Sequence, residues 1–137
     1  MNEPIDIYVD GSIKNGEALW GLVVVEGDVM IYSSSGRLSG EINEMRQIGG
    51  ELKAAMEAVR YARTNRIKVR IFHDYNGIFN WVADGWGGKA WQCNNEWTQK
   101  YREFILKNKE WIHSFVKVKG HSGNKWNEKA DEVAGNA

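Results

Sequence analysis

Four carboxylates and one histidine stand in this sequence at places where side chains commonly do chemistry. Asp10 and Asp74 each follow a run of alternating, β-branched residues that predicts a strand. Glu51 lies early in a long stretch with helical spacing, and Asp131 lies in a short C-terminal stretch of the same kind. His121 comes shortly before Asp131, on a turn with glycines on both sides. A carboxylate close behind such a histidine is typical of a hydrolytic site.

Four carboxylates that meet at one place need a cation. Without one, each carboxylate raises the pKa values of its neighbours, because like charges repel. Mg²⁺ prefers oxygen ligands and keeps several waters, so three or four carboxylates together with substrate phosphate oxygens suit it. Two such ions roughly 3.5–4 Å apart can activate a water and stabilise the leaving oxygen of an in-line displacement. The four acids therefore predict hydrolysis of a phosphodiester.

The elements that must hold these acids follow from the spacing of apolar residues. We expect strands over Ile5–Asp10, Ala18–Glu26, Val29–Ser33, Lys68–His73 and Ser114–Lys119. We expect helices from about Glu44 to Arg63 and over Asn76–Val82, Glu96–Lys109 and Trp126–Ala134. Gly11-Ser12 and Gly27-Asp28 predict turns, and the serines and glycines from Ser33 to Gly40 predict a loop.

This order of elements predicts an α/β fold in a single domain over residues 1–137. The first three strands would form an antiparallel meander. The fourth strand is reached by a helical crossover and is expected to lie parallel to the first. The whole is one five-stranded mixed sheet, with three antiparallel strands and then two parallel ones, and with helices packed on both faces.

Such a sheet would gather the acids. The carboxyl ends of the first and fourth strands lie side by side, at the edge where ligands of open α/β sheets bind, and Asp10 and Asp74 stand there. Glu51 shares its helix face with three alanines, so that face can approach the sheet closely. Alanines near Asp131 allow the same approach from the last helix.

Each acid also has an ordinary alternative role. Asp10 could serve only a turn before Gly11, and Glu51 could be favoured at a helix start by the helix dipole. Asp74 could cap the next helix, and Asp131 could be a solvated helix residue. These roles explain any one acid well. They explain poorly why four acids occur in this order on these elements.

Composition sets outer limits on function. The chain has 137 residues with 18 basic and 18 acidic side chains, so its zero net charge argues mildly against general nucleic-acid binding. Cys93 is the only cysteine, which excludes an intrachain disulfide and favours a reducing compartment. No apolar run is long enough to span a bilayer, and we expect no leader segment, because no charged-then-apolar stretch stands near Met1. We expect the protein to be a cytoplasmic monomer that has no obligate protein partner and does not associate with a membrane.

Four segments in order resemble the motifs of type 1 ribonuclease H. They are Tyr8-Val9-Asp10-Gly11-Ser12, Gln47-Ile48-Gly49-Gly50-Glu51-Leu52, His73-Asp74-Tyr75-Asn76-Gly77-Ile78 followed by Trp81, and Gly120-His121-Ser122-Gly123 followed by Asn127, Glu128 and Asp131. Each motif alone is weak, but four in this order along the whole chain are specific. The resemblance implies the ribonuclease H-like fold.

The resemblance also implies an activity, cofactors and site residues. The activity is that of a Mg²⁺-dependent endonuclease that cuts the RNA strand of an RNA–DNA hybrid and leaves 3′-hydroxyl and 5′-phosphate ends. Two Mg²⁺ ions act with substrate bound, and Mn²⁺ is able to substitute. The residues that match the family's metal-binding acids are Asp10, Glu51, Asp74 and Asp131, and His121 matches a loop histidine that assists proton transfer or product release.

Substrate contacts are implied in the same way. Backbone near Gly11 and Ser12 and the side chains of Gln47 and Asn76 match positions that contact RNA 2′-hydroxyls, the group that distinguishes RNA from DNA.

The segment 83–95, here called the handle, departs from the family. It occupies the place of a basic protrusion, yet Lys89 is its only cation. Trp86 and Trp91 could stack on nucleic acid. We expect instead that they join Trp81 and Trp97 in packing the handle onto the body.

Two other classes compete with this interpretation. A DNA-directed exonuclease of the same superfamily carries Asp-x-Glu on its first strand, whereas Ser12 stands in that place here, and transposases end their acid set with glutamate, whereas this chain has Asp131. A catalytically dead binding domain is the second alternative. Retention of all four acids and of His121 argues against it.

Overall fold

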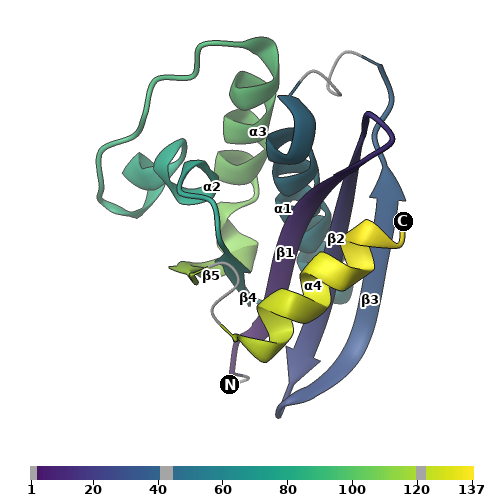
Figure 1. Ribbon diagram of the computed structural model, residues 1–137. Coiled ribbons are helices and arrows are strands. Elements are labelled where there is room, and N and C mark those ends of the chain that lie inside the picture. The colour runs from purple at the N-terminus through teal and green to yellow at the C-terminus, as the bar shows by residue number, and fades with distance from the viewer. Residues whose placement is uncertain (1–2, 41–44, 120–122) are drawn as a thin grey trace.

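The computed structural model describes residues 3–40, 45–119 and 123–137. The elements follow one another as β1 (Ile5–Lys14), β2 (Glu17–Glu26), β3 (Val29–Arg37), α1 (Arg46–Asn65), β4 (Val69–His73), α2 (Gly77–Asn80), η2 (Ala83–Trp86), α3 (Glu96–Lys107), η3 (Lys109–Trp111), β5 (Ile112–Lys117) and α4 (Lys125–Gly135), where η marks a short 3₁₀ helix (Figure 1). Within these ranges no helix is both long and apolar enough to cross a membrane. Glu44, the expected start of the long helix, lies outside the described residues.

The strands form one mixed sheet in the order β3-β2-β1-β4-β5. β1 pairs antiparallel with β2, and β2 pairs antiparallel with β3. β4 lies parallel to both β1 and β5, because α1 returns the chain to the starting end of the sheet. The expected fold class is therefore confirmed.

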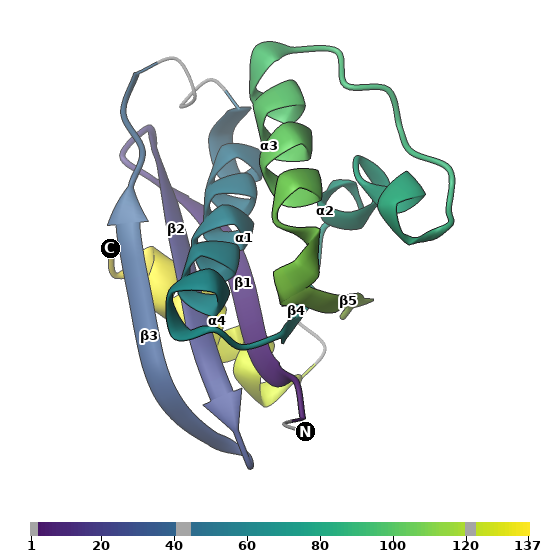
Figure 2. The same cartoon turned by 180° about the vertical axis from the view of Figure 1, so that it is seen from behind.

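Helices cover both faces of this sheet, as predicted. α1 and α3 lie on one face and α4 lies on the other (Figures 1 and 2). Alternate residues of β1 point to opposite faces, so Ile7 and Val9 join the larger core beneath α1 and α3. Tyr8 joins a smaller cluster with Val23 and Ala130 under α4.

α1 packs unusually close to the sheet because glycines face each other there. A Cβ on Gly11 of β1 would stand 2.5 Å from the backbone nitrogen of Glu51, and a Cβ on Gly50 would collide with the carbonyl oxygen of Leu19. Real side chains cannot occupy either place. The backbone that carries Glu51 is thereby brought directly against the strand that carries Asp10.

The first strand is longer than predicted, and its expected turn at Gly11-Ser12 is wrong. β1 continues to Lys14, and Gly11 pairs with Trp20 of β2. The chain reverses instead at Asn15-Gly16, where both residues have positive φ, 53° and 79°. A two-residue Asn-Gly hairpin is a strong sequence signal that was available. The hairpin at Gly27-Asp28 is confirmed, with Glu26 opposite Val29.

Two more boundaries differ from prediction. The expected loop from Ser33 is wrong over its first part, because β3 continues to Arg37 with Ser34 opposite Leu22 and Arg37 opposite Leu19. Serines and a glycine are tolerated there because β3 is an edge strand. β5 begins two residues earlier than expected, at Ile112.

The handle packs on the body mainly through aromatic rings. Trp86 lies edge-on to Phe115 with ring centroids 5.2 Å apart, and Trp91 lies edge-on to Trp81 with centroids 5.9 Å apart. The prediction is confirmed in part: Trp86 packs on the core, through Phe115 rather than another tryptophan, and Trp91 contacts Trp81 as expected but remains 45% exposed. Trp97 lies beneath the Lys100 ammonium, 4.8 Å from its ring centroid.

Candidate active site

Asp10 and Asp74 come together through the parallel register of β1 and β4. Tyr8 pairs with Phe72, so the residues two positions further on, Asp10 and Asp74, stand level with each other. The ladder between the two strands ends at the pair Tyr8 and Phe72, and β4 itself ends at His73. Both carboxylates therefore lie where the two strands separate and where a ligand has access. Asp10 lies within β1 rather than at its end.

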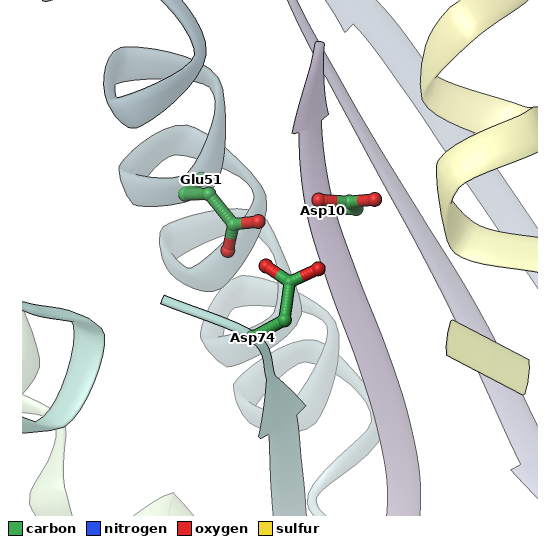
Figure 3. A group of neighbouring side chains, drawn as sticks. All are labelled: Asp10, Glu51 and Asp74. Carbon is green, nitrogen blue, oxygen red and sulfur yellow. The ribbon is translucent and has the colours of Figure 1, made fainter. Parts of the chain in front are cut away.

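Glu51 reaches the same place from α1. Carboxylate oxygens of Asp10, Glu51 and Asp74 lie within 4.8 Å of one another, and Figure 3 shows the three side chains converging from a strand, a helix and a strand end. The contact of α1 with the sheet, which the glycines allow, sets this distance. The sequence prediction that these three acids meet agrees with the geometry.

Asp131 lies at the rim of the cluster. It lines the same cavity of about 370 Å³ as the other three acids, together with Gly11, Gln47, Ile48 and Tyr75. Asn124 caps the N-terminus of α4 by accepting hydrogen bonds from the backbone nitrogens of Trp126 and Asn127, at 3.1 and 2.9 Å. The helix is thus fixed with buried Ala130 and Ala134 against the sheet and exposed Asp131 toward the cavity.

The acids differ sharply in their solvation. Asp10 is 6% and Glu51 3% exposed, whereas Asp74 is half-buried and Asp131 is exposed. The backbone N–H of Gly11 donates to Asp10 Oδ1 at 2.9 Å and to Glu51 Oε1 at 3.2 Å. Glu51 Oε2 is buried without a hydrogen-bond partner. A buried carboxylate oxygen without a partner is costly, and either a proton or a bound cation would stabilise it.

Burial and mutual repulsion both act on the pKa values of the inner acids. The pKa of Asp10 is raised to about 6, chiefly by burial and also by the charges of Asp74 and Asp131, against the hydrogen bonds from Glu51 and Gly11, which lower it. Burial also raises the pKa of Glu51 well above its usual range, and its contact with Asp10 adds to the effect. A divalent cation between them would reverse both shifts, since it favours the charged forms.

This donor set fits a hard divalent cation. It consists of carboxylate oxygens alone, one of them buried and unpartnered, and it opens on a cavity that leaves room for water and a phosphate. Mg²⁺ takes such oxygen ligands and retains waters, whereas softer metals favour histidine or cysteine. The group is therefore compatible with a bound metal.

The predicted substrate residues are distributed unevenly. Gly11 and Gln47 line the cavity, and the Gly11 N–H is already engaged by the two inner acids. Ser12 is paired with Leu19 in the β1–β2 ladder. Asn76 precedes α2 and lines a neighbouring cavity of about 150 Å³. The predicted catalytic His121 lies outside the described residues.

Three residues beside the acids lie within the segments that resemble the family motifs, but the sequence predicted no role for them. Tyr75 and Ile48 line the cavity, and Gly50 permits the close approach of α1. Gly49-Gly50 directly before an acid in a helix was a usable signal, because glycine inside a helix is destabilising and calls for a packing reason. Tyr75 and Ile48 carried no such signal, because they line the cavity only once the folded chain brings them beside the acids.

Known proteins resemble this chain over nearly its full length. The RNase H family model matches residues 2–137. Ribonuclease H of Hahella chejuensis is 35% identical over 143 residues, covering 95% of this chain and 90% of the relative. Ribonuclease H of Chlorobium luteolum is 30% identical over 145 residues, covering 98% and 94%.

Solved structures show the same fold. The crystal structure of RNase H1 from the halophilic archaeon Halobacterium salinarum superposes with a TM-score of 0.75 at 16% identity, over 98% of this chain and 97% of that one. LC11-RNase H1, solved in complex with an RNA/DNA hybrid, superposes with a TM-score of 0.71 at 20% identity, over 97% and 95%.

Proposed function

The chain belongs to the RNase H family and is a ribonuclease H, and on this premise we propose that it hydrolyses the RNA strand of RNA–DNA hybrids by two-metal-ion catalysis. The observation that carries the proposal is the convergence of Asp10, Glu51 and Asp74 within 4.8 Å, with Asp131 on the rim of the same cavity. The hybrid bound in the LC11-RNase H1 structure supports the choice of substrate.

Asp10, Glu51, Asp74 and Asp131 are proposed to hold the metal. Glu51 Oε2 would supply a buried oxygen that lacks a hydrogen-bond partner, and Asp10 and Asp74 would supply carboxylate oxygens within 4.8 Å of Glu51. Two Mg²⁺ ions, for which Mn²⁺ is able to substitute, would supply an activated water and stabilise the charge that develops on the leaving oxygen. Half-buried Asp74 and exposed Asp131 would complete the ligand set on the side of the cluster that faces solvent.

The proposed reaction balances as a hydrolysis. The oxygen of a water forms a bond to the scissile phosphorus, and the bond from phosphorus to the 3′-oxygen of the RNA breaks. The 3′-oxygen receives a proton, so the products carry 3′-hydroxyl and 5′-phosphate ends. His121 is proposed to assist this proton transfer or the release of product.

Gln47, Asn76 and the backbone near Gly11 and Ser12 are proposed to choose RNA over DNA. Gln47 is exposed at the cavity rim and Asn76 is exposed at the start of α2, so both can reach a strand that passes over the acids. Their amides can donate to and accept from 2′-hydroxyls. Residues 1–137 act as one catalytic domain in this proposal.

A cleavage assay tests the proposal. The protein is incubated with an RNA–DNA hybrid, duplex DNA and duplex RNA of the same sequence, with Mg²⁺ or with chelator, and Asp10→Asn serves as the control against a contaminating nuclease. We expect cleavage of the RNA strand of the hybrid alone, with Mg²⁺ alone. Equal cleavage of duplex DNA would favour a DNA-directed nuclease, and hybrid binding without cleavage would favour a dead binding domain.

A further inference from the structure

Asp74 lies just beyond the part of β4 that the sheet holds. The ladder with β1 ends at Phe72. The ladder with β5 ends at His73, where the backbone N–H of Val118 donates to the His73 carbonyl at 2.7 Å. Figure 3 shows the Asp74 carboxylate at the tip of the strand, facing the other two acids. The direction of this carboxylate therefore depends on how the chain turns after His73.

The side chain of His73 closes this turn. Its Nδ1 lies 2.9 Å from the carbonyl oxygen of Tyr75. Because a carbonyl oxygen only accepts, the imidazole carries a hydrogen on Nδ1 and donates it. The bond runs from the residue before Asp74 to the residue after it and thus spans the acid. The ring is 1% exposed and lies edge-on to Phe115, with ring centroids 6.1 Å apart, so packing fixes its orientation.

The bond from His73 does not serve to satisfy an orphaned carbonyl. The carbonyl of Tyr75 also accepts the backbone N–H of Ile78 at 3.2 Å. The second ring nitrogen, Nε2, is buried and has no hydrogen-bond partner among the described residues, so the bond to Tyr75 is the only one that the ring makes with them. What this bond adds is a restraint on the two peptide units on either side of Asp74.

The segment that follows is held independently from α3. The hydroxyl of Tyr101 donates to the carbonyl of Ile78 at 2.6 Å, and the guanidinium of Arg102 donates to the carbonyl of Trp81 at 3.0 Å. These bonds attach α2 and the residue after it to the body of the protein. Loss of the histidine bond would therefore loosen the chain around Asp74 without releasing α2.

We propose that His73 is a positioning residue that orients Asp74 for the metal. By donating to the carbonyl beyond the acid, it directs the carboxylate toward Asp10 and Glu51. Carboxylate oxygens of the three acids lie within 4.8 Å of one another, and a loosely held Asp74 would not keep that spacing. Groups that hold a metal ligand in place are typically worth roughly 10–100-fold in metal affinity or activity. The inference rests on the proposed function, because it takes Asp74 as a metal ligand.

Titration with Mg²⁺, followed by NMR on the backbone amides, tests the inference without an activity assay. His73→Leu keeps a side chain that branches at the same carbon but removes the donor, and it should weaken Mg²⁺ binding ~10-fold. His73→Asn keeps an N–H at the position of Nδ1 and loses the rest of the ring. It should therefore be less stable than wild type, because it leaves a cavity, yet bind Mg²⁺ within ~3-fold of wild type.

Asn108→Leu is the matched control. Asn108 is another buried side chain that donates to a carbonyl, that of Phe104 at 2.8 Å, and it lines no part of the catalytic cavity. This variant should melt at a lower temperature than wild type and bind Mg²⁺ as wild type does. Asp74→Asn should lose most of its Mg²⁺ affinity, which establishes that the titration reports on the acid cluster.

An unchanged affinity in His73→Leu, beside a loss in Asp74→Asn, would overturn the inference and leave the proposed function standing. A loss in His73→Asn as large as that in His73→Leu would also overturn it, because the ring and not the bond would then be what matters. Should His73→Leu not fold, His73→Phe, which keeps a ring without a donor, takes its place. Wild-type protein that binds no Mg²⁺, or Asp74→Asn that binds it as well as wild type, would overturn both the inference and the proposed function.

Discussion

The inner and the outer acids of the cavity are built in different ways. Asp10 and Glu51 are almost fully buried on elements held together by glycine contacts, and the Gly11 N–H donates to both. Asp74 follows the last residue of a strand and Asp131 lies exposed on a helix surface. Backbone packing and a shared hydrogen-bond donor thus hold the inner pair in place, whereas the outer pair lies closer to solvent.

This difference assigns different tasks to the two pairs. A fixed, buried pair with raised pKa values destabilises the metal-free protein, but it provides a preorganised place for charge. An exposed carboxylate loses little when its charge is removed, because water already solvates it. We therefore expect the inner pair to control the pH dependence of stability, the half-buried Asp74 to act with that pair in metal binding, and the exposed Asp131 to tune turnover.

The largest effect should come from charge removal at Asp10 and Asp74, the two acids that face each other where the strands separate. Asp10→Asn should nearly abolish hybrid cleavage, by at least ~100-fold, because the loss of charge stabilisation from a metal raises the barrier by several kcal/mol. Asp74→Asn, which faces Asp10 across the strand ends, should fall in the same range. Asp131→Asn should lose only ~10-fold. Single-turnover rates at saturating Mg²⁺ measure all three.

Circular dichroism confirms that these variants fold, and Asp84→Asn on the handle is the control for charge removal away from the cavity. The comparison fails if Asp10→Asn keeps more than a tenth of wild-type activity. It also fails if Asp131→Asn is as inactive as Asp10→Asn.

A smaller effect is expected at His121. General acid–base assistance is typically worth ~10²–10⁴-fold, and water can replace part of it, so His121→Ala should slow turnover by ~10–100-fold. Calorimetric titration with Mg²⁺ should show unchanged metal affinity. Loss of metal binding in this variant would make His121 a ligand or a structural residue instead.

The contrast between the acid pairs could be foreseen only in part from sequence. The positions of the four acids followed from strand and helix patterns, and the parallel register brought Asp10 and Asp74 together as expected. The burial of Glu51 could not be predicted from the sequence, because it depends on the contact between Gly11 and Gly50, which lie 39 positions apart in the chain. Strand ends were misjudged for a related reason, since pairing with β2 carried β1 and β3 through segments whose local sequence favours turns and loops.

The pH dependence of the stability of the metal-free protein should also distinguish the buried inner acids from the outer acids. The pKa of Asp10 is raised from 3.8 to about 6, so between those values the folded state binds a proton that the unfolded state releases. This contribution makes stability fall as pH rises through that window, and Glu51 extends the fall to higher pH. Burial lowers the pKa of His73 from 6.5 to about 4, which has the opposite sign in the same window.

The difference between Glu51→Gln and wild type isolates the acid, since His73 is common to both. In chelator, Glu51→Gln should gain stability relative to wild type as pH rises from 4 to 8, by on the order of 1–3 kcal/mol. Mg²⁺ should raise the melting temperature of wild type and have much less effect on the variant. If the stability difference between the variant and wild type did not change with pH, burial would not raise the pKa of Glu51.

The smallest effect is expected on the handle, far from both acid pairs. Arg102 donates two hydrogen bonds of 2.6 Å to Asp84, and Lys100 pairs with Glu96 at 2.9 Å, so neither cation is free of an acidic partner. Lys89→Ala should change the Michaelis constant for hybrid less than ~2-fold, and the salt dependence of binding should be shallow. Binding isotherms at several salt concentrations check this, and a steep slope would place the phosphate track elsewhere on the surface.

Two-metal-ion catalysis is the central proposal. It requires contact between a metal ion and the scissile phosphate, and a sulfur substitution tests that contact most directly. A hybrid is prepared with sulfur in place of each non-bridging oxygen of one cleavable phosphate in turn, and each form is cleaved with Mg²⁺, Mn²⁺ or Cd²⁺. Sulfur binds the hard Mg²⁺ weakly and softer ions well. We predict that at least one substitution slows cleavage with Mg²⁺ by more than ~10-fold and that Mn²⁺ or Cd²⁺ restores the rate. Equal rates with every ion, for both substitutions, would contradict the account.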